Sequence, residues 1–290
     1  MLLQLIASTL RVSTPLIFAA MGGLLSERSG IINIALEGMM LAGAFGAAVG
    51  ALATHSPWLG LLAGLGAGVI LAAVYGLFVI PLRANQIVAG TAINMLALGL
   101  TPFCCKILYD VTGSTPALPL EERFQSAPLY LCWIVVGVCV GWLKYTRGGL
   151  RLSFAGENPA ALDAAGIGVN RVRWLAVLAS GALAGAGGAT LSICLSSSFS
   201  RNMTAGRGFM ALAALIFGKW KPWPTAAACL LFGFTEALQI RLQGVRLFGD
   251  APVPVQFIQI LPYVATILVL AGFVGRARAP KALGTPFVRE

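Results

Sequence analysis

The side chains that could do covalent chemistry are few in this sequence of 290 residues. Its only histidine is His55, so the HExxH zinc motif cannot form and a Ser-His-Asp triad would have to use that one side chain. The pair Gly218-Lys219 is not part of a phosphate-binding P-loop, because Ala213 and Trp220 occupy the positions of its first glycine and its Ser or Thr. A GxSxG motif is also absent from the sequence. We therefore expect no hydrolytic centre in this chain.

Cysteine side chains could bind zinc, but their spacing does not favour it. None of the six forms a CxxC pair, and only one histidine is available to complete a site. Cysteines in apolar segments usually behave as small hydrophobic residues. We therefore expect neither a metal site nor a cofactor in this chain. All six lie in or at the end of apolar runs: Cys104, Cys105, Cys132, Cys139, Cys194 and Cys229.

The composition sets the solvent in which this chain folds. Hydrophobic residues make up 58% of it, charged residues 10%, and the mean hydropathy is +0.86. A soluble domain carries about 25% charged residues, and so few charges would leave apolar patches larger than a soluble monomer tolerates. A soluble enzyme, a nucleic-acid-binding module and a disordered tail are therefore excluded. We predict an all-α polytopic membrane protein with about eight to ten transmembrane helices of about 20 residues each.

The apolar segments divide the chain into nine candidate spans within a single transmembrane domain, residues 1–290. Two of them are unusual. The first contains Arg11, which is costly at the centre of a bilayer, so part of it could lie along the interface. The range 208–218 is too short to cross about 30 Å of hydrocarbon at 1.5 Å per residue, so we expect a short, broken or re-entrant helix packed within the protein. The segments are Leu2–Leu25, Ile34–Ala53, Trp58–Ile80, Ile87–Cys105, Pro128–Leu143, Trp174–Leu195, Gly208–Gly218, Pro222–Ile240 and Val255–Val274.

The basic residues indicate the orientation, because loops rich in Lys and Arg stay on the cytoplasmic side. They also explain the net charge of +10 without a nucleic-acid partner. With nine crossings, the loop 144–173 and the C-terminus are cytoplasmic, and the loop 106–127 is external. The external side then keeps Lys106, Arg123, Arg201, Arg207, Arg241 and Arg246. The cytoplasmic side receives Arg28, Arg83, Lys144, Arg147, Arg151, Arg171, Arg173, Lys219, Lys221, Arg276, Arg278, Lys281 and Arg289.

Acidic residues within the apolar segments are too few for an evident ion pathway. Ion-coupled carriers usually place ionisable residues in the middle of the membrane. Glu37 lies about one turn into the second segment and Glu236 near the end of the eighth, and neither has an acidic or histidine partner in the pattern. Asp110, Glu121 and Glu122 fall in the external loop. The pattern therefore argues against a proton or sodium pathway without excluding one.

Two short stretches echo each other in segments of opposite predicted direction. They are 38–42 (GMMLA) and 208–212 (GFMAL). Inverted repeats, which are common in transporters, would produce such a match. Chance similarity in sequence rich in Ala, Gly and Leu remains the alternative.

The loop 144–173 contains a capped helix. Asn158 is a good N-cap, Pro159 suits the first helical position, and Gly166 can end the helix in the left-handed conformation. The helix of about two turns would present small side chains, with Leu162 and Ile167 as apolar contacts. We interpret it as a knob that fits a groove on a cytoplasmic partner. A solvated connection is the alternative.

Three long motifs carry a resemblance to a known family. They are 26–45 (SERSGIINIALEGMMLAGAF), 156–167 (GENPAALDAAGI) and 202–220 (NMTAGRGFMALAALIFGKW). Together they resemble the permease subunits of ATP-binding-cassette (ABC) importers of the simple-sugar and nucleoside branch, which share their fold with branched-chain amino-acid permeases. The first motif, in a chain of this length, is most similar to the shorter nucleoside permease subunits. The resemblance covers the chain from about Leu10 to the last apolar segment.

This resemblance implies a type II ABC importer-like fold, several partners and a location. The chain would be a multi-pass protein of the bacterial plasma (inner) membrane, in contact with the lipid bilayer and with no nucleic acid. A second, longer permease paralogue would complete a heterodimer, and an extracytoplasmic binding protein or lipoprotein would deliver a nucleoside or a simple sugar. A cytoplasmic ATPase would bind ATP and Mg. It would dock on the coupling helix, here Gly156, Glu157, Asn158, Pro159, Ala160, Ala161, Leu162, Asp163, Ala165, Gly166 and Ile167.

Polar side chains in the apolar segments are candidates for the translocation path. For each of them, a hydrogen bond between helices is at least as good an explanation. Glu37 could also pair with Arg28 or Arg83 at the inner rim. The alternative function is that of a stand-alone secondary carrier or facilitative channel, which has no use for a capped knob. The candidates are Asn33, Glu37, Gln86, Thr91, Asn94 and Glu236.

Overall fold

The computed structural model describes residues 2–242, 260, 264 and 278–288. The expected last span, Val255–Val274, therefore lies outside the described residues apart from two single positions. Helices of the α, π and 3-10 types make up the regular structure of the described part, together with one isolated β-bridge between Ser114 and Ser200, as expected for an all-α protein. The helices are α1 (Leu2–Arg28), α2 (Leu36–Thr54), α3 (Pro57–Val79), α4 (Gln86–Tyr109), η1 (Leu120–Glu122), α5 (Ala127–Tyr145), α6 (Arg147–Glu157), α7 (Pro159–Ala164), α8 (Val169–Thr190), η2 (Leu191–Leu195), α9 (Arg207–Phe217) and α10 (Pro222–Leu242).

Seven helices of the described part are long and apolar enough to cross a membrane. They coincide with seven of the predicted segments. The first is one continuous helix that contains Arg11 and Pro15. α9 has 11 residues, and it is the short helix expected at 208–218. Its N-terminus and its buried face are packed within the bundle, as the sequence predicted.

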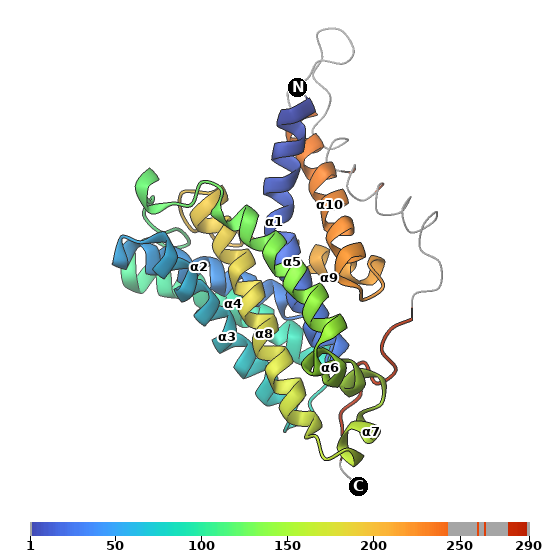
Figure 1. Ribbon diagram of the computed structural model, residues 1–290. Coiled ribbons are helices and arrows are strands. Elements are labelled where there is room, and N and C mark those ends of the chain that lie inside the picture. Colours follow the sequence, from blue (N-terminus) through green and yellow to red (C-terminus); the bar gives the residue numbers. More distant parts are fainter. Residues whose placement is uncertain (1, 243–259, 261–263, 265–277, 289–290) are drawn as a thin grey trace.

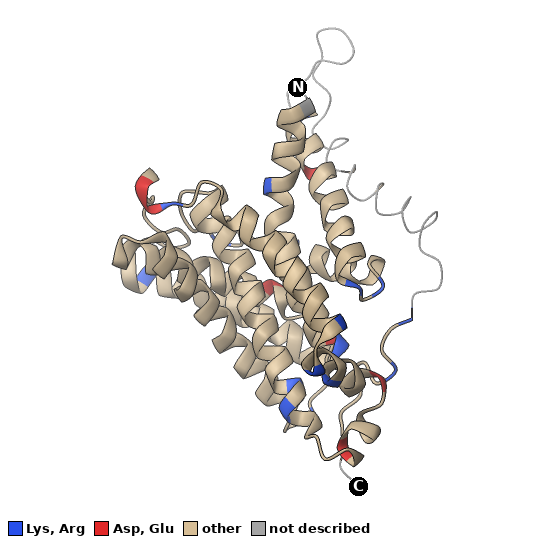
Figure 2. Ribbon diagram, in the orientation of Figure 1, with Lys and Arg blue, Asp and Glu red and all other residues tan. Residues whose placement is uncertain are grey.

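The helices define two ends of the bundle, which we name the α6–α7 end and the η1 end (Figure 1). The described C-terminal residues lie at the α6–α7 end, where the amide of Ala282 donates to the carbonyl of Gly156 at 2.8 Å and that of Gly284 to Gly30 at 2.9 Å. The N-terminus lies at the opposite end (Figure 1). Lys and Arg gather around α6 and the first turns of α8 (Figure 2). The two loops at these ends are shorter than expected, because α4 extends to Tyr109 and α8 begins at Val169.

Two stretches of irregular backbone interrupt the bundle. We name residues 29–35, between α1 and α2, the first break, and residues 196–206, between η2 and α9, the second break. The second break lets a helix of only 11 residues continue the chain from the η1 end towards α10. Irregular backbone at membrane depth is tolerated only where protein groups satisfy it, so each break needs dedicated hydrogen-bond partners.

The packing of the second half of the chain repeats that of the first half. α3 packs on α8 as α10 packs on α1, and α2 contacts α3 and α8 as α9 contacts α10 and α1. The start of the second echoing stretch also lies beside the residue that precedes the first, because a Cβ added at Gly208 would lie 2.5 Å from the Cα of Glu37. This arrangement favours an inverted repeat over a chance match as the origin of the echo.

Small residues allow α2, α3 and α8 to approach closely. A Cβ at Gly188 of α8 would clash with the carbonyl oxygen of Met40 in α2, and one at Gly185 would lie 2.5 Å from the carbonyl oxygen of Gly64 in α3. Close backbone approach through glycine is a recurrent way to pack membrane helices. Gly188 and Gly185 therefore act in helix packing and need no functional explanation.

We expect Gly188→Ala to destabilise the protein by about 1–3 kcal/mol, because the added methyl group forces two packed backbones apart. The matched control is Gly66→Ala in α3, where an added Cβ meets nothing within 4 Å. This change should leave stability unchanged or raise it slightly, since alanine favours helix. The free energy of unfolding in a mild detergent measures both. Equal effects of the two changes would contradict the packing argument.

Candidate functional site

The predicted coupling helix is present as α7, Pro159–Ala164. The Asn158 side chain accepts a hydrogen bond from the amide of Ala161 at 3.1 Å, and Pro159 follows at the first helical position. Gly166 has a φ of 77°, and its amide donates to the carbonyl of Asp163 at 2.8 Å. The N-cap and the left-handed glycine predicted from the sequence are therefore confirmed. We refer to residues 157–167 as the peg.

A second helix, α6, precedes the peg and was not predicted. It spans Arg147–Glu157, and the Thr146 side chain caps it by accepting from the amide of Gly149 at 3.1 Å. One face of α6 is buried through Leu152, Ala155 and Gly156. The capping threonine and this apolar spacing were the sequence signals for a helix. The basic residues of the stretch led instead to the prediction of a polar loop.

Leu162 does not point towards a partner, which corrects the expectation for this residue. Its side chain is 5% exposed and packs with Ala155 of α6 and Val169 of α8. Ile167 and Phe287 cover the same cluster. Leu162 therefore seats the peg on the protein, and replacing it would test this seating rather than docking. The exposed surface of the peg consists of small residues with two polar ones: Glu157, Asn158, Ala160, Ala161, Ala164, Ala165 and Gly166.

The base of the peg is tied to the first break. Gly156 lies against the carbonyl of Arg28, with no room for a side chain. Arg173 of α8 is 2% exposed and donates from Nε to the carbonyl of Ser29 at 3.2 Å and from Nη1 to that of Thr285 at 3.0 Å. The peg, the start of α8, the described C-terminal residues and the first break therefore form one connected unit.

Candidate path residues satisfy the irregular backbone of the first break. The Gln86 side chain accepts from the amide of Ile32 at 2.8 Å. Asn94 accepts from the amide of Gly38 at 2.8 Å and donates to the carbonyl of Ile34 at 3.0 Å. The sequence analysis missed Tyr75, whose hydroxyl donates to the carbonyl of Ile32. No signal in the sequence distinguished this residue from the other aromatic residues of the apolar segments.

Glu37 holds the second break. Its carboxylate accepts from the amide of Gly206 at 2.8 Å through Oε1 and from that of Gly208 at 2.6 Å through Oε2. These amides are at the N-terminus of α9, where the helix dipole favours a negative charge. The carboxylate is thus occupied by backbone amides, and the suggested pairing with Arg28 or Arg83 is wrong.

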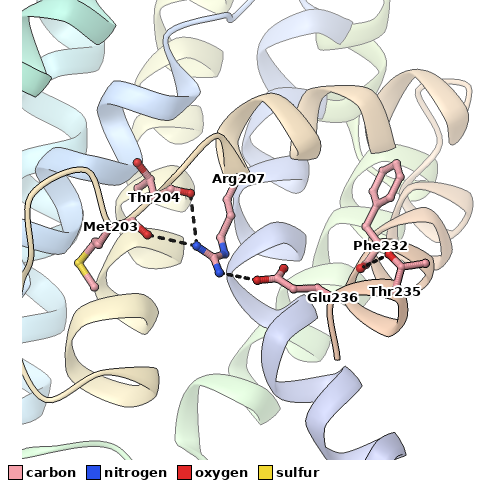
Figure 3. Close-up of polar contacts among 6 residues, drawn as sticks. All are labelled: Met203, Thr204, Arg207, Phe232, Thr235 and Glu236. Atoms are coloured by element: carbon pink, nitrogen blue, oxygen red, sulfur yellow. Dashed lines mark hydrogen bonds and ion pairs between the residues drawn. The ribbon is translucent and has the colours of Figure 1, made fainter. Parts of the chain in front are cut away.

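Glu236 acts on the same break through Arg207, which the sequence analysis had placed on the external side (Figure 3). Its Oε1 atom lies 2.5 Å from Nη2 of Arg207. Arg207 in turn donates from Nη1 to the carbonyl oxygens of Met203 at 3.2 Å and Thr204 at 3.4 Å. Glu37 and Glu236, which lie 199 positions apart in the sequence, therefore both stabilise the backbone where the second break meets α9.

The two remaining candidates differ from each other. Asn33 is fully buried, and its Nδ2 atom donates to the Ser180 hydroxyl at 2.8 Å, while its Oδ1 has no partner among the described residues. Thr91 is on the exposed side of α4 and donates only to the carbonyl of Val88. Five of the six candidates thus form hydrogen bonds to other segments of the protein, which was the alternative explanation for them. Thr91 lies on an outward surface. No group of three His, Cys, Asp or Glu residues in the described part could hold a metal ion.

Comparison with known proteins identifies the family. Residues 5–270 match the family described as the permease component of the branched-chain amino acid transport system. The guanosine ABC transporter permease protein NupQ of Bacillus subtilis (strain 168) is 39% identical over 98% of this chain and 96% of its own length. Two proteins of Lactococcus lactis subsp. cremoris (strain MG1363) also match. The nucleoside ABC transporter permease protein NupC is 38% identical over 99% of this chain and 97% of its own length, and NupB is 25% identical over 96% and 83%.

These matches confirm the family resemblance carried by the three motifs. They extend over nearly the full length of the chain, and seven helices of the described residues are long and apolar enough to cross a membrane. The chain therefore belongs to the family of branched-chain amino acid transport permease components and is a multi-pass membrane protein.

Proposed function

We propose that this chain is the membrane-spanning subunit of an ATP-driven importer for nucleosides. The observation that carries this proposal is the similarity, at 38–39% identity over nearly the full length, to permeases whose names specify guanosine and nucleosides. The seated, capped peg supports the ATP-driven class, because a carrier that works alone has no need of such a structure. ATP and Mg bind to a partner ATPase, and this chain performs no hydrolysis itself.

The second permease subunit is a longer paralogue. NupB of Lactococcus lactis supports this part of the proposal, because this chain matches it over 96% of its own length but only 83% of that protein. The same organism has NupC, to which this chain is more similar. Two related but unequal permeases would form the heterodimer, and an extracytoplasmic binding protein or lipoprotein would deliver the nucleoside to it.

The α6–α7 end faces the cytoplasm in this proposal. Basic residues are retained on the cytoplasmic side, and Lys and Arg gather at this end (Figure 2). The described C-terminal residues are bonded to Gly30 and Gly156 at the same end, which supports a cytoplasmic C-terminus. In a bacterium this places the protein in the plasma (inner) membrane.

The contacts around the peg suggest how motion reaches the membrane. Closure of the ATPase displaces the peg, and Leu162 and Arg173 carry this displacement to the first turn of α8 and to Ser29. Ser29 begins the first break, whose hydrogen bonds to Gln86 and Asn94 connect it to α4. Displacement of the peg therefore changes the position of α4, on whose outward side Thr91 lies. A shift of packed helices of this kind opens one side of a path and closes the other.

Uptake by reconstituted vesicles tests the proposal. The chain is reconstituted with its paralogue and the ATPase, the binding protein is added outside, and labelled guanosine is supplied with or without ATP inside. We expect accumulation only with ATP and the ATPase, suppressed by excess unlabelled nucleoside and not by ribose or glucose. Uptake by this chain without an ATPase would favour the stand-alone carrier. Suppression by ribose alone would show that the importer transports a simple sugar and not a nucleoside.

A further inference from the structure

An apolar crevice opens between α5 and α8 at the α6–α7 end, where Gly166 and Ile167 of the peg also line it. α5 and α8 both pack on α1, and Leu25 of α1 lines the crevice between them. Its volume is about 900 Å³. The walls are apolar: Val135, Val138 and Cys139 of α5, and Leu175, Ala176, Ala179, Ala182 and Leu183 of α8.

The rim of the crevice is chemically different from its walls. Arg151 of α6 and Arg171 of α8 line it, both exposed, and neither makes a hydrogen bond or ion pair with any residue in the described ranges. Trp142 lies beside them and packs against Gly148, where an added Cβ would be 2.8 Å from the indole ring. Tryptophan and basic residues are typical of the level of the lipid headgroups. The crevice therefore begins at the membrane surface and continues into the hydrocarbon.

The depth of the crevice fits one leaflet of the bilayer. Between Arg171 and Leu183, α8 rises about 18 Å at 1.5 Å per residue, and half of the hydrocarbon core is about 15 Å. A transmembrane helix of a partner subunit is about 30 Å long, longer than the crevice is deep. The occupant that fits is amphipathic, with an anionic group at the surface and a chain about as long as one leaflet.

We propose that the crevice between α5 and α8 binds one anionic phospholipid of the leaflet at the α6–α7 end. The phosphate lies between Arg151 and Arg171, and one acyl chain lies against Val138 and Leu175. Basic pockets between membrane helices bind anionic headgroups in this way, and arginine suits phosphate because its guanidinium donates two parallel hydrogen bonds. Bound there, the lipid joins α5 and α8, the two long helices between which α6 and the peg lie in the sequence. Its presence therefore stiffens the packing of α5 against α8.

Quenching of Trp142 fluorescence by brominated lipids tests the proposal. The full chain is placed in phosphatidylcholine nanodiscs with a small fraction of phosphatidylglycerol brominated near the headgroup end of its acyl chains, or with brominated phosphatidylcholine instead. The signal of Trp142 is the difference between the wild type and Trp142→Phe. We expect phosphatidylglycerol to quench this signal at several-fold lower mole fraction than phosphatidylcholine does.

Variants distinguish a specific lipid-binding site from the general attraction of anionic lipids to a positively charged surface. Arg151→Gln with Arg171→Gln should weaken the preference for phosphatidylglycerol by at least about fivefold, the effect of a single basic residue near an anionic surface. The matched control, Arg83→Gln with Lys221→Gln, removes two exposed cations that do not line the crevice, and it should keep the preference. Ala179→Phe, which fills the crevice and leaves both arginines, should lower quenching by phosphatidylglycerol to the level of bulk lipid.

Three results would overturn the proposal. One is equal quenching by the two lipids in the wild type, which would mean that neutral lipid or detergent fills the crevice. Another is an equal loss in the control variant, which would mean surface attraction only. The third is unchanged quenching in Ala179→Phe when circular dichroism shows the native helix content. The readout uses no ATPase, paralogue or substrate, so it does not depend on the proposed function.

Discussion

Glu37→Ala should lower the free energy of unfolding by about 2–6 kcal/mol. The carboxylate accepts hydrogen bonds from the buried amide of Gly208 and from the part-buried amide of Gly206, and Glu37 itself is 8% exposed. Each buried N–H that loses its partner costs about 1–3 kcal/mol, and the sum over the two amides gives the expected range. A protein with a total stability of about 5–15 kcal/mol would lose a large part of it.

Titration with a denaturing detergent, followed by circular dichroism, measures this loss. Glu37→Gln keeps the size of the side chain but turns an NH₂ group towards one of the two amides, so about half of the effect should remain. Glu121→Ala is the matched control, because Glu121 is an exposed acid in the η1 loop, and it should change stability by less than about 0.5 kcal/mol. If Glu37→Ala stayed within the range of this control, the carboxylate would not be what holds the second break.

Ala164→Arg should abolish ATP-driven uptake while the protein inserts and folds normally. Ala164 is exposed on the peg, and the small residues beside it let a partner approach closely. A bulky, charged side chain in the middle of such an interface costs about 2–4 kcal/mol, as for other central contacts, which lowers the docking affinity by roughly 30- to 1,000-fold. Co-purification of the ATPase and guanosine uptake, measured on the same preparations, report the effect.

Asn170→Arg is the control for this variant. It introduces the same side chain on an exposed position of the first turn of α8, outside the peg, and it should leave both readouts close to those of the wild type. Leu162→Asp should also prevent docking, but through loss of the contacts with Ala155 and Val169, so it should increase proteolysis within residues 144–173 as well. Normal co-purification of the ATPase with Ala164→Arg would show that docking occurs elsewhere.

The prediction from sequence succeeded where the causes are local. A long apolar run forms a helix in lipid whatever its neighbours are, because the backbone must satisfy its own hydrogen bonds, and the first eight predicted segments correspond to helices. The ends of the peg are local as well. Asn158 bonds to an amide three residues away and Gly166 needs only its own φ, so the residue types were sufficient evidence.

The roles of the polar residues could not be deduced in the same way. Glu37 and Glu236 were recognisable as costly residues in apolar segments, and the sequence analysis considered both transport and structure. Their partners are Gly206, at the end of the second break, and Arg207 and Gly208, in the first turn of α9. The nearest of the amides bonded to Glu37 is 169 residues away in the sequence. An irregular backbone segment does not reveal in its sequence which distant side chain will satisfy it.

The face of a short helix is also a property of the whole fold. In the sequence, Leu162 and the alanines around it were equally available to a partner or to the protein. Packing of α6 and α8 under the peg gave Leu162 its place and left the alanines exposed. Sequence alone thus determined the solvent, the spans, the capped helix and the family motifs, because these depend on composition and on neighbours along the chain. The satisfaction of the two breaks, the orientation of the peg and the crevice between α5 and α8 depend on contacts between distant segments, and only the tertiary structure decided them.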